Sequence, residues 1–247
     1  MKRQSGLLEE ILELQENVMN DNKMKDCLNY LEDSMARQFD MTTVVRLMSL
    51  YSLMQDGLAD KEFKSLSKLF LQAYGYRHVA TLHCLERLQL FSVKESKKLH
   101  SFLLEEPLLP EKLFHAPEKS SFRKICRKLN LLPEEKNGEN HPSYVFGGVY
   151  TPLIYKLVDN CLKEKDNPSL DDFVRCYGND LRSNSHNNPH WNRPGRILVM
   201  VIGGVTLAEV AALNLLGRQL GRQIIVAATS TISGNSLVQT ISSSNDT

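Results

Sequence analysis

The sequence predicts a mostly α-helical protein with a C-terminal α/β part, and three features lead to this fold class. Apolar residues recur every three or four positions over residues 1–132, which is the period of amphipathic helices. The polar, turn-rich residues 133–142 interrupt this pattern and predict a linker. Within residues 143–247, two stretches that are apolar at every position flank an amphipathic helix, which is typical of parallel strands buried on both faces.

Five helices are predicted in the first 90 residues. Asp60 is suited to begin the fourth, while Gly57 and Gly75 are placed to end the third and the fourth. The fifth is expected to run from Tyr76 to Leu90. The apolar residues expected to face the core are, helix by helix, Leu7, Leu8, Ile11, Leu12 and Leu14; Cys27, Leu28, Leu31 and Met35; Val44, Leu47, Met48, Tyr51 and Met54; Phe63, Leu66, Leu69, Phe70 and Ala73; and Val79, Leu82, Leu85 and Leu88.

A connector and a sixth helix complete the helical region. Residues 92–117 are charged and contain prolines, so we expect them to run over the surface. The residues expected to face inward from the sixth helix are Phe122, Ile125, Cys126 and Leu129.

The C-terminal region begins with residues 144–146, a short stretch of β-prone residues. Thr151 and Pro152 are then suited to begin a helix that ends near Leu162. A further helix is predicted after residue 167, and a polar loop over residues 178–195.

A β-α-β unit is predicted next, formed by strand 197–202, helix 206–220 and strand 224–228. Thr206 and Glu209 match a T-x-x-E capping box at the start of that helix. Residues 233–236 resemble the entry to a final helix. Two or three strands make a poor parallel sheet, so we infer that residues outside this chain, or a partner, complete it.

A membrane span was considered for residues 197–217, which carry a single charge. Gly203 and Gly204 would interrupt such a helix at its middle, and Glu209 would lie deep in hydrocarbon. A strand followed by a tight turn at the two glycines and a helix that contains Glu209 explains all three residues, so no membrane span is predicted.

The composition disfavours several function classes. Thirty basic and 29 acidic residues give a net charge of +1, without the concentrated basic face of a nucleic-acid-binding protein. The five cysteines are scattered and odd in number, which argues against a disulfide framework and a structural zinc site. The first residues lead directly into a polar amphipathic helix rather than a secretory signal, so a reducing, cytosolic compartment is expected.

No catalytic residue, cofactor or metal site is predicted. His186 and His190 have a spacing that would suit a metal on a helix, but Pro189 and the neighbouring asparagines predict a loop. The Gly203-Gly204 turn could hold a phosphate, although a glycine pair between a strand and a helix more often only forms the turn. A nucleotide- or phosphate-binding α/β enzyme domain with a helical module is therefore the alternative function.

Four segments together carry a family resemblance: LQAYGYRHVATLHCLERLQLF (71–91), SFRKICRKLNLLP (121–133), HPSYVFGGVYTPLIYKLVDNCL (141–162) and ILVMVIGGVTLAEVAALNLLGRQLGRQIIVAATSTISGNSLVQTI (197–241). In this order they resemble the Sec/Munc-type (SM) family of SNARE regulators, in its class C vacuolar-sorting branch. The similarity covers nearly the whole chain, and different segments resemble the two paralogue types of that branch.

The resemblance implies an arch of three domains, of which this chain would be the C-terminal portion. Residues 1–132 would be the end of domain 3, and residues 143–247 the second half of domain 2, whose parallel sheet is split across the longer chain. The N-terminal domain that contributes to binding a syntaxin-type SNARE would lie outside this chain, as would most of the helical hairpin that templates SNARE pairing.

The resemblance also implies a docking site for a partner subunit. The YGYxH match indicates that Tyr76 and Val79, with Lys68, contact the C-terminal helical solenoid of vacuolar protein sorting-associated protein 16 or its relative. Periodicity alone predicts instead that Tyr76 and Val79 are core residues at the start of a helix. An exposed tyrosine beside a branched apolar residue is a typical interface anchor, and together with the resemblance this favours the interface.

The function that the resemblance implies is non-enzymatic. The chain would regulate SNARE-mediated vesicle docking and fusion as a subunit of a class C vacuolar or endolysosomal tethering complex. Its association with late endosome, lysosome or vacuole membranes would be peripheral and through partners, with SNARE proteins bound in the full-length context. Neither a nucleic acid nor a cofactor is expected.

Overall fold

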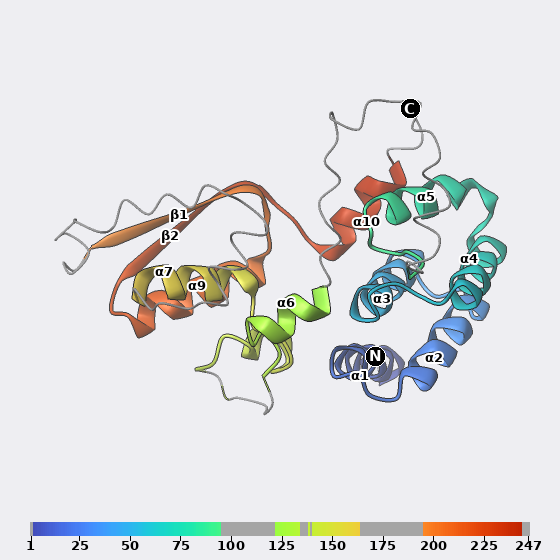
Figure 1. Ribbon diagram of the computed structural model, residues 1–247, viewed down its shortest axis with the longest axis horizontal. Coiled ribbons are helices and arrows are strands. Elements are labelled where there is room, and N and C mark those ends of the chain that lie inside the picture. Colours follow the sequence, from blue (N-terminus) through green and yellow to red (C-terminus); the bar gives the residue numbers. More distant parts are fainter. Residues whose placement is uncertain (1, 95–121, 134–137, 139, 164–194, 244–247) are drawn as a thin grey trace, which may run out of the picture. The chain divides into compact units, whose positions relative to one another are not determined.

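The computed structural model describes residues 2–94, 122–133, 138, 140–163 and 195–243 (Figure 1). These residues are mostly helical and include one two-stranded parallel sheet. They form two compact units, a helical unit within residues 1–123 and 234–247 and an α/β unit within residues 124–233.

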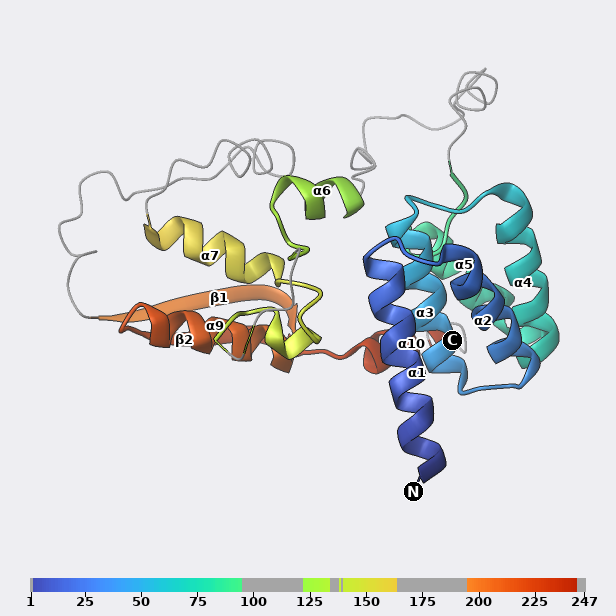
Figure 2. The same ribbon diagram turned by 90° about the horizontal axis from the view of Figure 1, so that it is seen from below.

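The helical unit contains α1 (Lys2–Met19), α2 (Met24–Ala36), α3 (Met41–Met54), α4 (Asp60–Tyr74), the 3-10 turn η1 (Tyr76–His78), α5 (Val79–Arg87) and α10 (Gly234–Ser243). The five helices predicted in the first 90 residues are present, with the fifth beginning as a 3-10 turn. Helix α3 packs against α1, α2 and α10 and lies at the centre of the unit (Figure 2). All five of its predicted core residues are buried.

The predicted apolar stripe of α1 is only partly buried. Leu14 is buried together with Val18 and Met19, whereas Leu8 and Leu12 are exposed. Figure 2 shows that the N-terminal half of α1 extends beyond the helices that pack against its C-terminal half. The burial of this helix is therefore decided by what lies beside it rather than by its own periodicity.

The loop between α3 and α4 holds the start of the predicted connector in place. Leu58 donates its backbone N–H to the Ser92 carbonyl oxygen and accepts from Lys94, both at 2.8 Å. Gly57 has a φ of 95°, and a Cβ there would lie 2.9 Å from the Lys94 backbone nitrogen, so this position requires glycine. Residues 95–117 of the predicted connector fall outside the described residues.

The α/β unit contains η2 (Tyr144–Phe146), α7 (Leu153–Lys163), β1 (Arg196–Val205), α9 (Leu207–Gln219) and β2 (Gln223–Thr231), and α6 (Phe122–Lys128) begins at the division between the units. The β-prone residues 144–146 form a 3-10 turn, which corrects the sequence expectation. Gly147 and Gly148 both have positive φ and turn the chain back, and the Gly148 N–H donates to the Ser143 carbonyl oxygen at 2.9 Å. The helix predicted after residue 167 and loop residues 178–194 fall outside the described residues.

The division between the units lies before the predicted linker at 133–142, and α10 groups with the helical unit. Cys126 of α6 and Leu129, directly after α6, are buried, and the Thr151 N–H donates to the Leu131 carbonyl oxygen at 2.7 Å. These contacts attach α6 to the start of α7. In the helical unit, α10 packs on α3 and α5, where the Arg46 Nη1 donates to the Asn235 Oδ1 at 2.9 Å.

Strands β1 and β2 pair in parallel, with Arg196 opposite Gln223 and Val201 opposite Ala228. Both α7 and α9 lie on one side of this sheet (Figure 1). The core on that side contains Tyr155, Ala212, Leu213, Leu216 and Ile224, and Ile197, Val199 and Val226 of the strands pack against it. The β-α-β unit and the capping box at Thr206 are thus confirmed.

Residues 197–217 form most of β1 and most of α9, so the predicted strand and helix are confirmed. The predicted turn at Gly203 and Gly204 is wrong, because β1 continues to Val205 and only its pairing with β2 shifts between Val201 and Gly204. Among the described residues, no helix is long and apolar enough to cross a membrane.

Candidate protein-docking site

The chain turns sharply between α4 and α5, at the position of the predicted docking residues. Gly75 ends α4 with a φ of 98°, a value that favours glycine, and its N–H donates to the Leu71 carbonyl oxygen at 2.9 Å. The His78 N–H then donates to the Gly75 carbonyl oxygen at 3.2 Å, which forms the 3-10 turn that leads into α5. We refer to residues 75–79 as the α4–α5 corner.

Aromatic side chains fix the α4–α5 corner to the core. Phe70 is fully buried, and its ring centroid lies 5.1 Å from that of Tyr74 and 6.2 Å from that of His78. The Tyr74 hydroxyl donates to the Phe39 carbonyl oxygen at 2.7 Å, and burial raises the pKa of Tyr74, with a further rise from Asp40. The packing of these rings and one hydrogen bond therefore fix the corner to the rest of the helical unit.

Two apolar side chains of the corner face solvent. Tyr76 is 75% exposed and Val79 is 51% exposed, so the alternative that both are core residues is wrong. Helix α5 buries Thr81 and Leu85 instead. Val79 and Leu88 lie nine residues apart, which places them on opposite sides of a helix with 3.6 residues per turn, and a three-residue repeat cannot keep four residues on one face.

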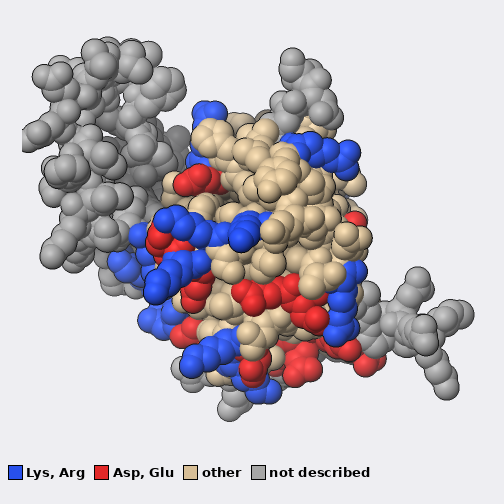
Figure 3. Space-filling view, turned by 90° about the vertical axis from the view of Figure 1, so that its right-hand side faces the viewer, with Lys and Arg blue, Asp and Glu red and all other residues tan. Residues whose placement is uncertain are grey.

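Lys68, the third predicted docking residue, is exposed on α4. It follows the buried Leu66 by two residues, which places it on the opposite side of the helix. Figure 3 views the molecule from the side of α4 and α5, where an area without charged side chains lies above a belt of mixed charge. Tyr76 and Val79 belong to the α4–α5 corner, and the exposed Lys68 belongs to the preceding helix.

A second apolar surface lies on the α/β unit, on the sheet face away from α7 and α9. Side chains alternate along a strand, so Leu198, Met200 and Ile202 point away from the helices and are 65%, 68% and 87% exposed. Ile225 lies opposite Leu198 on β2 and is also exposed. Strands that are apolar on both faces are covered on both faces in folded proteins.

The C-terminal end of β1, at Gly203, does not offer a phosphate site. The Gly203 N–H donates to the Thr229 Oγ1 at 2.9 Å, and that hydroxyl donates back to the Gly203 carbonyl oxygen at 2.6 Å. At the start of α9, the Glu209 carboxylate accepts from the Thr206 N–H at 2.8 Å and from its hydroxyl at 2.7 Å. A negative charge already occupies the helix N-terminus, so the alternative enzyme function is not supported.

The remaining residues considered for chemistry do not form a site in the described part of the chain. Burial raises the pKa of the Cys126 thiol to about 11, so it is protonated near neutral pH and is a poor nucleophile. No group of three or more His, Cys, Asp and Glu side chains is positioned for a metal among the described residues. His186 and His190 lie outside them.

Comparison with known proteins gives consistent matches. A sequence model described as the Sec1 family matches residues 2–240. The chain is 27% identical to vacuolar protein sorting-associated protein 33B of Danio rerio over 258 residues, covering 94% of this chain and 41% of the relative. The human protein of the same name is also 27% identical, and the match covers 95% of this chain and 41% of that protein. The vacuolar protein-sorting-associated protein 33 homolog of Arabidopsis thaliana is 27% identical, with 93% and 38% covered. The chain therefore spans about two-fifths of the length of these relatives.

Proposed function

The chain belongs to the Sec1 family, and from this premise we propose that it is a non-enzymatic regulator of SNARE-mediated vesicle docking and fusion. It acts as a subunit of a class C vacuolar or endolysosomal tethering complex, by holding partner proteins. Relatives named for vacuolar protein sorting, matched over most of this chain, support this proposal.

The observation that carries the proposal is the exposure of Tyr76 and Val79 on a corner that is otherwise well fixed. Exposed aromatic and branched apolar side chains on a rigid support are typical interface anchors, because little conformational entropy is lost when they are buried. Lys68 is exposed on the helix that leads into the corner. Together these residues form the docking site for the C-terminal helical solenoid of vacuolar protein sorting-associated protein 16 or its relative.

The open sheet face supports the proposed place of this segment in a longer chain. Its exposed residues, Leu198, Met200 and Ile202, need cover that the described residues do not provide. Residues 143–247 would supply the second half of a split parallel sheet, and residues 1–132 the end of the preceding helical domain. In this arrangement SNARE proteins bind the full-length protein, and membrane association at late endosomes, lysosomes or vacuoles is peripheral and through partners.

A pull-down with the partner solenoid tests the docking site. We expect Tyr76→Asp and Val79→Lys each to weaken binding by at least tenfold, because truncated or charged anchors at interface centres cost about 2 kcal/mol or more. Leu88→Lys is the matched control, since Leu88 is an exposed apolar residue at the end of α5 on the side opposite Val79. Circular dichroism of each variant checks that helical content is unchanged.

Three outcomes would contradict the proposal. Wild-type chain that is folded yet does not bind the solenoid would remove the partner assignment. Equal loss of binding in Leu88→Lys would show that the assay responds to surface charge rather than to the corner. Binding that survives both corner variants would place the docking site elsewhere.

A further inference from the structure

The α4–α5 corner and the helices on either side of it carry positive charge that no nearby acidic residue of the sequence balances. Residues 63–85 contain two lysines and one arginine but no aspartate or glutamate, although the whole chain has 30 basic and 29 acidic residues. Lys64 is offset by Asp60, with 2.7 Å between Nζ and Oδ2. Within the described part of the chain, neither Lys68 nor Arg77 forms an ion pair, and both are exposed.

The described helices that form the corner or pack on α5 do not supply a balancing negative charge. The acidic residues of α4 and α5 are Asp60, Glu62 and Glu86, and all three lie at the helix ends away from the corner. Helices α3 and α10 contain no acidic residue. The Asp40 carboxylate, at the start of α3, already accepts from the Thr43 N–H at 2.9 Å and from its hydroxyl at 3.0 Å. Among these elements Arg77 thus has no acidic partner and is available to a carboxylate of another protein.

The Arg77 side chain is oriented by its neighbour in the 3-10 turn. Arg77 Nε donates to His78 Nε2 at 3.1 Å, which requires this ring nitrogen to be unprotonated. The His78 ring packs edge-on against the buried Phe70 ring, with 6.2 Å between the centroids and an interplanar angle of 69°. Because only Nε is engaged, the two terminal amino groups of the guanidinium remain available. Their parallel N–H groups match the two oxygens of a carboxylate.

We propose that Arg77 is a further anchor of the docking site and that the partner solenoid places an aspartate or glutamate against it. This inference rests on the proposed function, because it specifies the partner's chemistry at the same site. Tyr76 and Val79 supply exposed apolar surface at the same corner, and water excluded by their contact with the partner strengthens an ion pair beside them. Lys68 adds a weaker attraction at longer range. The corner therefore selects a partner with an acidic residue beside an apolar patch and disfavours a basic surface.

Charge variants of the full chain test the anchor, with the solenoid of vacuolar protein sorting-associated protein 16 as the probe and calorimetric titration as the measurement. We expect Arg77→Gln to weaken binding at least tenfold, because it leaves a partner carboxylate unpaired in the interface. Arg77→Lys should weaken binding only about threefold, since lysine keeps the charge but lacks the planar pair of donors. Arg87→Gln is the matched control, because it removes the same charge from an exposed residue in the last turn of α5. It should change binding less than twofold.

Salt dependence distinguishes an ion pair from apolar packing. The affinity of the wild type should fall about threefold or more as the ionic strength rises from about 0.05 to about 0.5 M, because salt screens the attraction between charges. Arg77→Gln should show a smaller fall, whereas Arg87→Gln should keep the dependence of the wild type. An equal salt dependence in Arg77→Gln and the wild type would overturn the ion pair.

A double-mutant cycle identifies the chemistry on the other side. Each acidic residue on the solenoid surface is changed to its amide, and each variant is titrated with the wild-type chain and with Arg77→Gln. We expect one amide variant to weaken binding to the wild type about as much as Arg77→Gln does, and to add little in the Arg77→Gln background. If no solenoid variant shows this coupling, the group opposite Arg77 is not a carboxylate and the inference is wrong.

The remaining outcomes separate this inference from the proposed function. Binding that Tyr76→Asp weakens and Arg77→Gln leaves unchanged would overturn the inference alone and keep the docking site. Equal weakening by Arg87→Gln and Arg77→Gln would show a general effect of net charge, which also overturns it. A folded wild-type chain that does not bind the solenoid would remove the proposed function and this inference together.

Discussion

The helical unit and the α/β unit both expose apolar side chains, but in different arrangements. At the α4–α5 corner, Tyr76 and Val79 stand on a core that includes the fully buried Phe70. On the α/β unit, α7 and α9 cover one face of the sheet, and no other described element covers the exposed apolar residues of the opposite face. At the corner, only two apolar side chains are exposed, and the residues beneath them are fully packed. On the sheet, the exposed apolar side chains indicate a core that the described residues leave incomplete.

The difference teaches how to interpret exposed apolar residues. Single exposed apolar residues on well-packed support are candidates for partner binding, since removing them should leave the fold intact. A continuous exposed sheet face is first a requirement of folding, because apolar strands need cover before any partner is considered. The following predictions test this distinction, beginning with the largest expected effect.

Matched cavity variants compare the two cores directly. Leu66 in α4 and Leu213 in α9 are both fully buried, and Leu→Ala at such sites costs about 2–5 kcal/mol. We expect the loss of stability to be near the upper end of this range for Leu66→Ala and near the lower end for Leu213→Ala. The reason is that a unit with an uncovered sheet face can relax into a cavity more easily. Amide hydrogen exchange, measured separately for peptides from each unit, reports the two free energies of opening. Equal losses would remove the proposed difference between the cores.

Gly204→Ala probes the C-terminal end of β1. A Cβ at this position would lie 2.5 Å from the Ile232 Cγ2, so we expect the free energy of unfolding to fall by about 1–2 kcal/mol. Shortening the neighbour in the double variant Gly204→Ala with Ile232→Ala should recover part of that loss, and denaturant unfolding of the single and double variants measures it. Calorimetric titration with ATP should show no binding by wild type. Specific ATP binding that Gly204→Ala abolishes would instead restore the enzyme alternative.

The smallest expected effect is a pH dependence at the start of the α/β unit. The Ser143 N–H donates to His141 Nδ1 at 3.2 Å, which requires that nitrogen to be unprotonated, and burial together with the Lys156 charge lowers the pKa of His141. The folded-state pKa is thus below the ordinary value of 6.5, so the stabilisation is present above pH 6.5 and is lost as pH falls below it. We expect the loss to be less than about 1 kcal/mol between pH 7.5 and 5.5.

Denaturant unfolding at the two pH values measures this loss, with His141→Ala as the comparison. The variant should lack the contribution of this imidazole, so its free energy of unfolding should depend less on pH than that of the wild type. An identical slope in wild type and variant would assign the dependence to other groups.

Several elements could be predicted because their signals are local. The capping box of Thr206 and Glu209 depends on residues three apart, and the hydrogen bonds between them are present as expected. The stripes of α2, α3 and α4 gave helices within a few residues of their observed bounds, since a 3.6-residue period is visible in any window of that length. The all-apolar strands likewise predicted the parallel pair.

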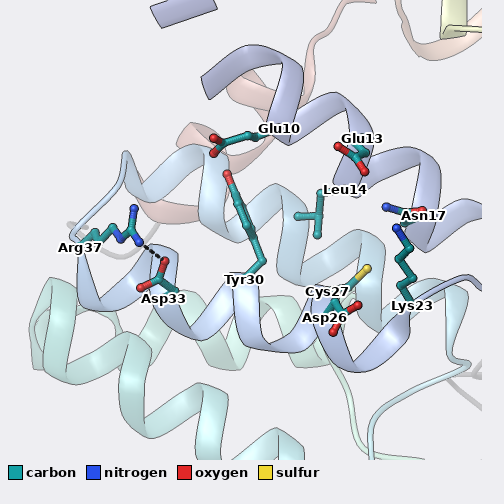
Figure 4. A pocket seen from close by; sticks show the side chains of 10 residues that line it. All are labelled: Glu10, Glu13, Leu14, Asn17, Lys23, Asp26, Cys27, Tyr30, Asp33 and Arg37. Atoms are coloured by element: carbon teal, nitrogen blue, oxygen red, sulfur yellow. Dashed lines mark ion pairs between the residues drawn. The ribbon is translucent and has the colours of Figure 1, made fainter. Parts of the chain in front are cut away.

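The features that sequence analysis missed depend on contacts between distant residues. Residues 144–146 looked β-prone, but the two glycines after them turn the chain back, and they have no strand partner in the described part of the chain. Helix α10 joins the helical unit through contacts such as Arg46 with Asn235, which lie 189 positions apart. A groove between α1 and α2, lined by Glu10, Glu13 and Asp26 among others, exists only because two helices with separate charged faces lie side by side (Figure 4).

By itself, the sequence determined the helices, the β-α-β unit and the family to which the chain belongs, because these follow from local periodicity and from runs of matching residues. Only the tertiary structure decided which apolar residues are buried. Val79 and Leu85 fit the same apolar repeat, yet Val79 is half exposed and Leu85 is fully buried. Burial depends on what packs against each side of a helix, and that is a property of the whole unit rather than of any segment of the chain.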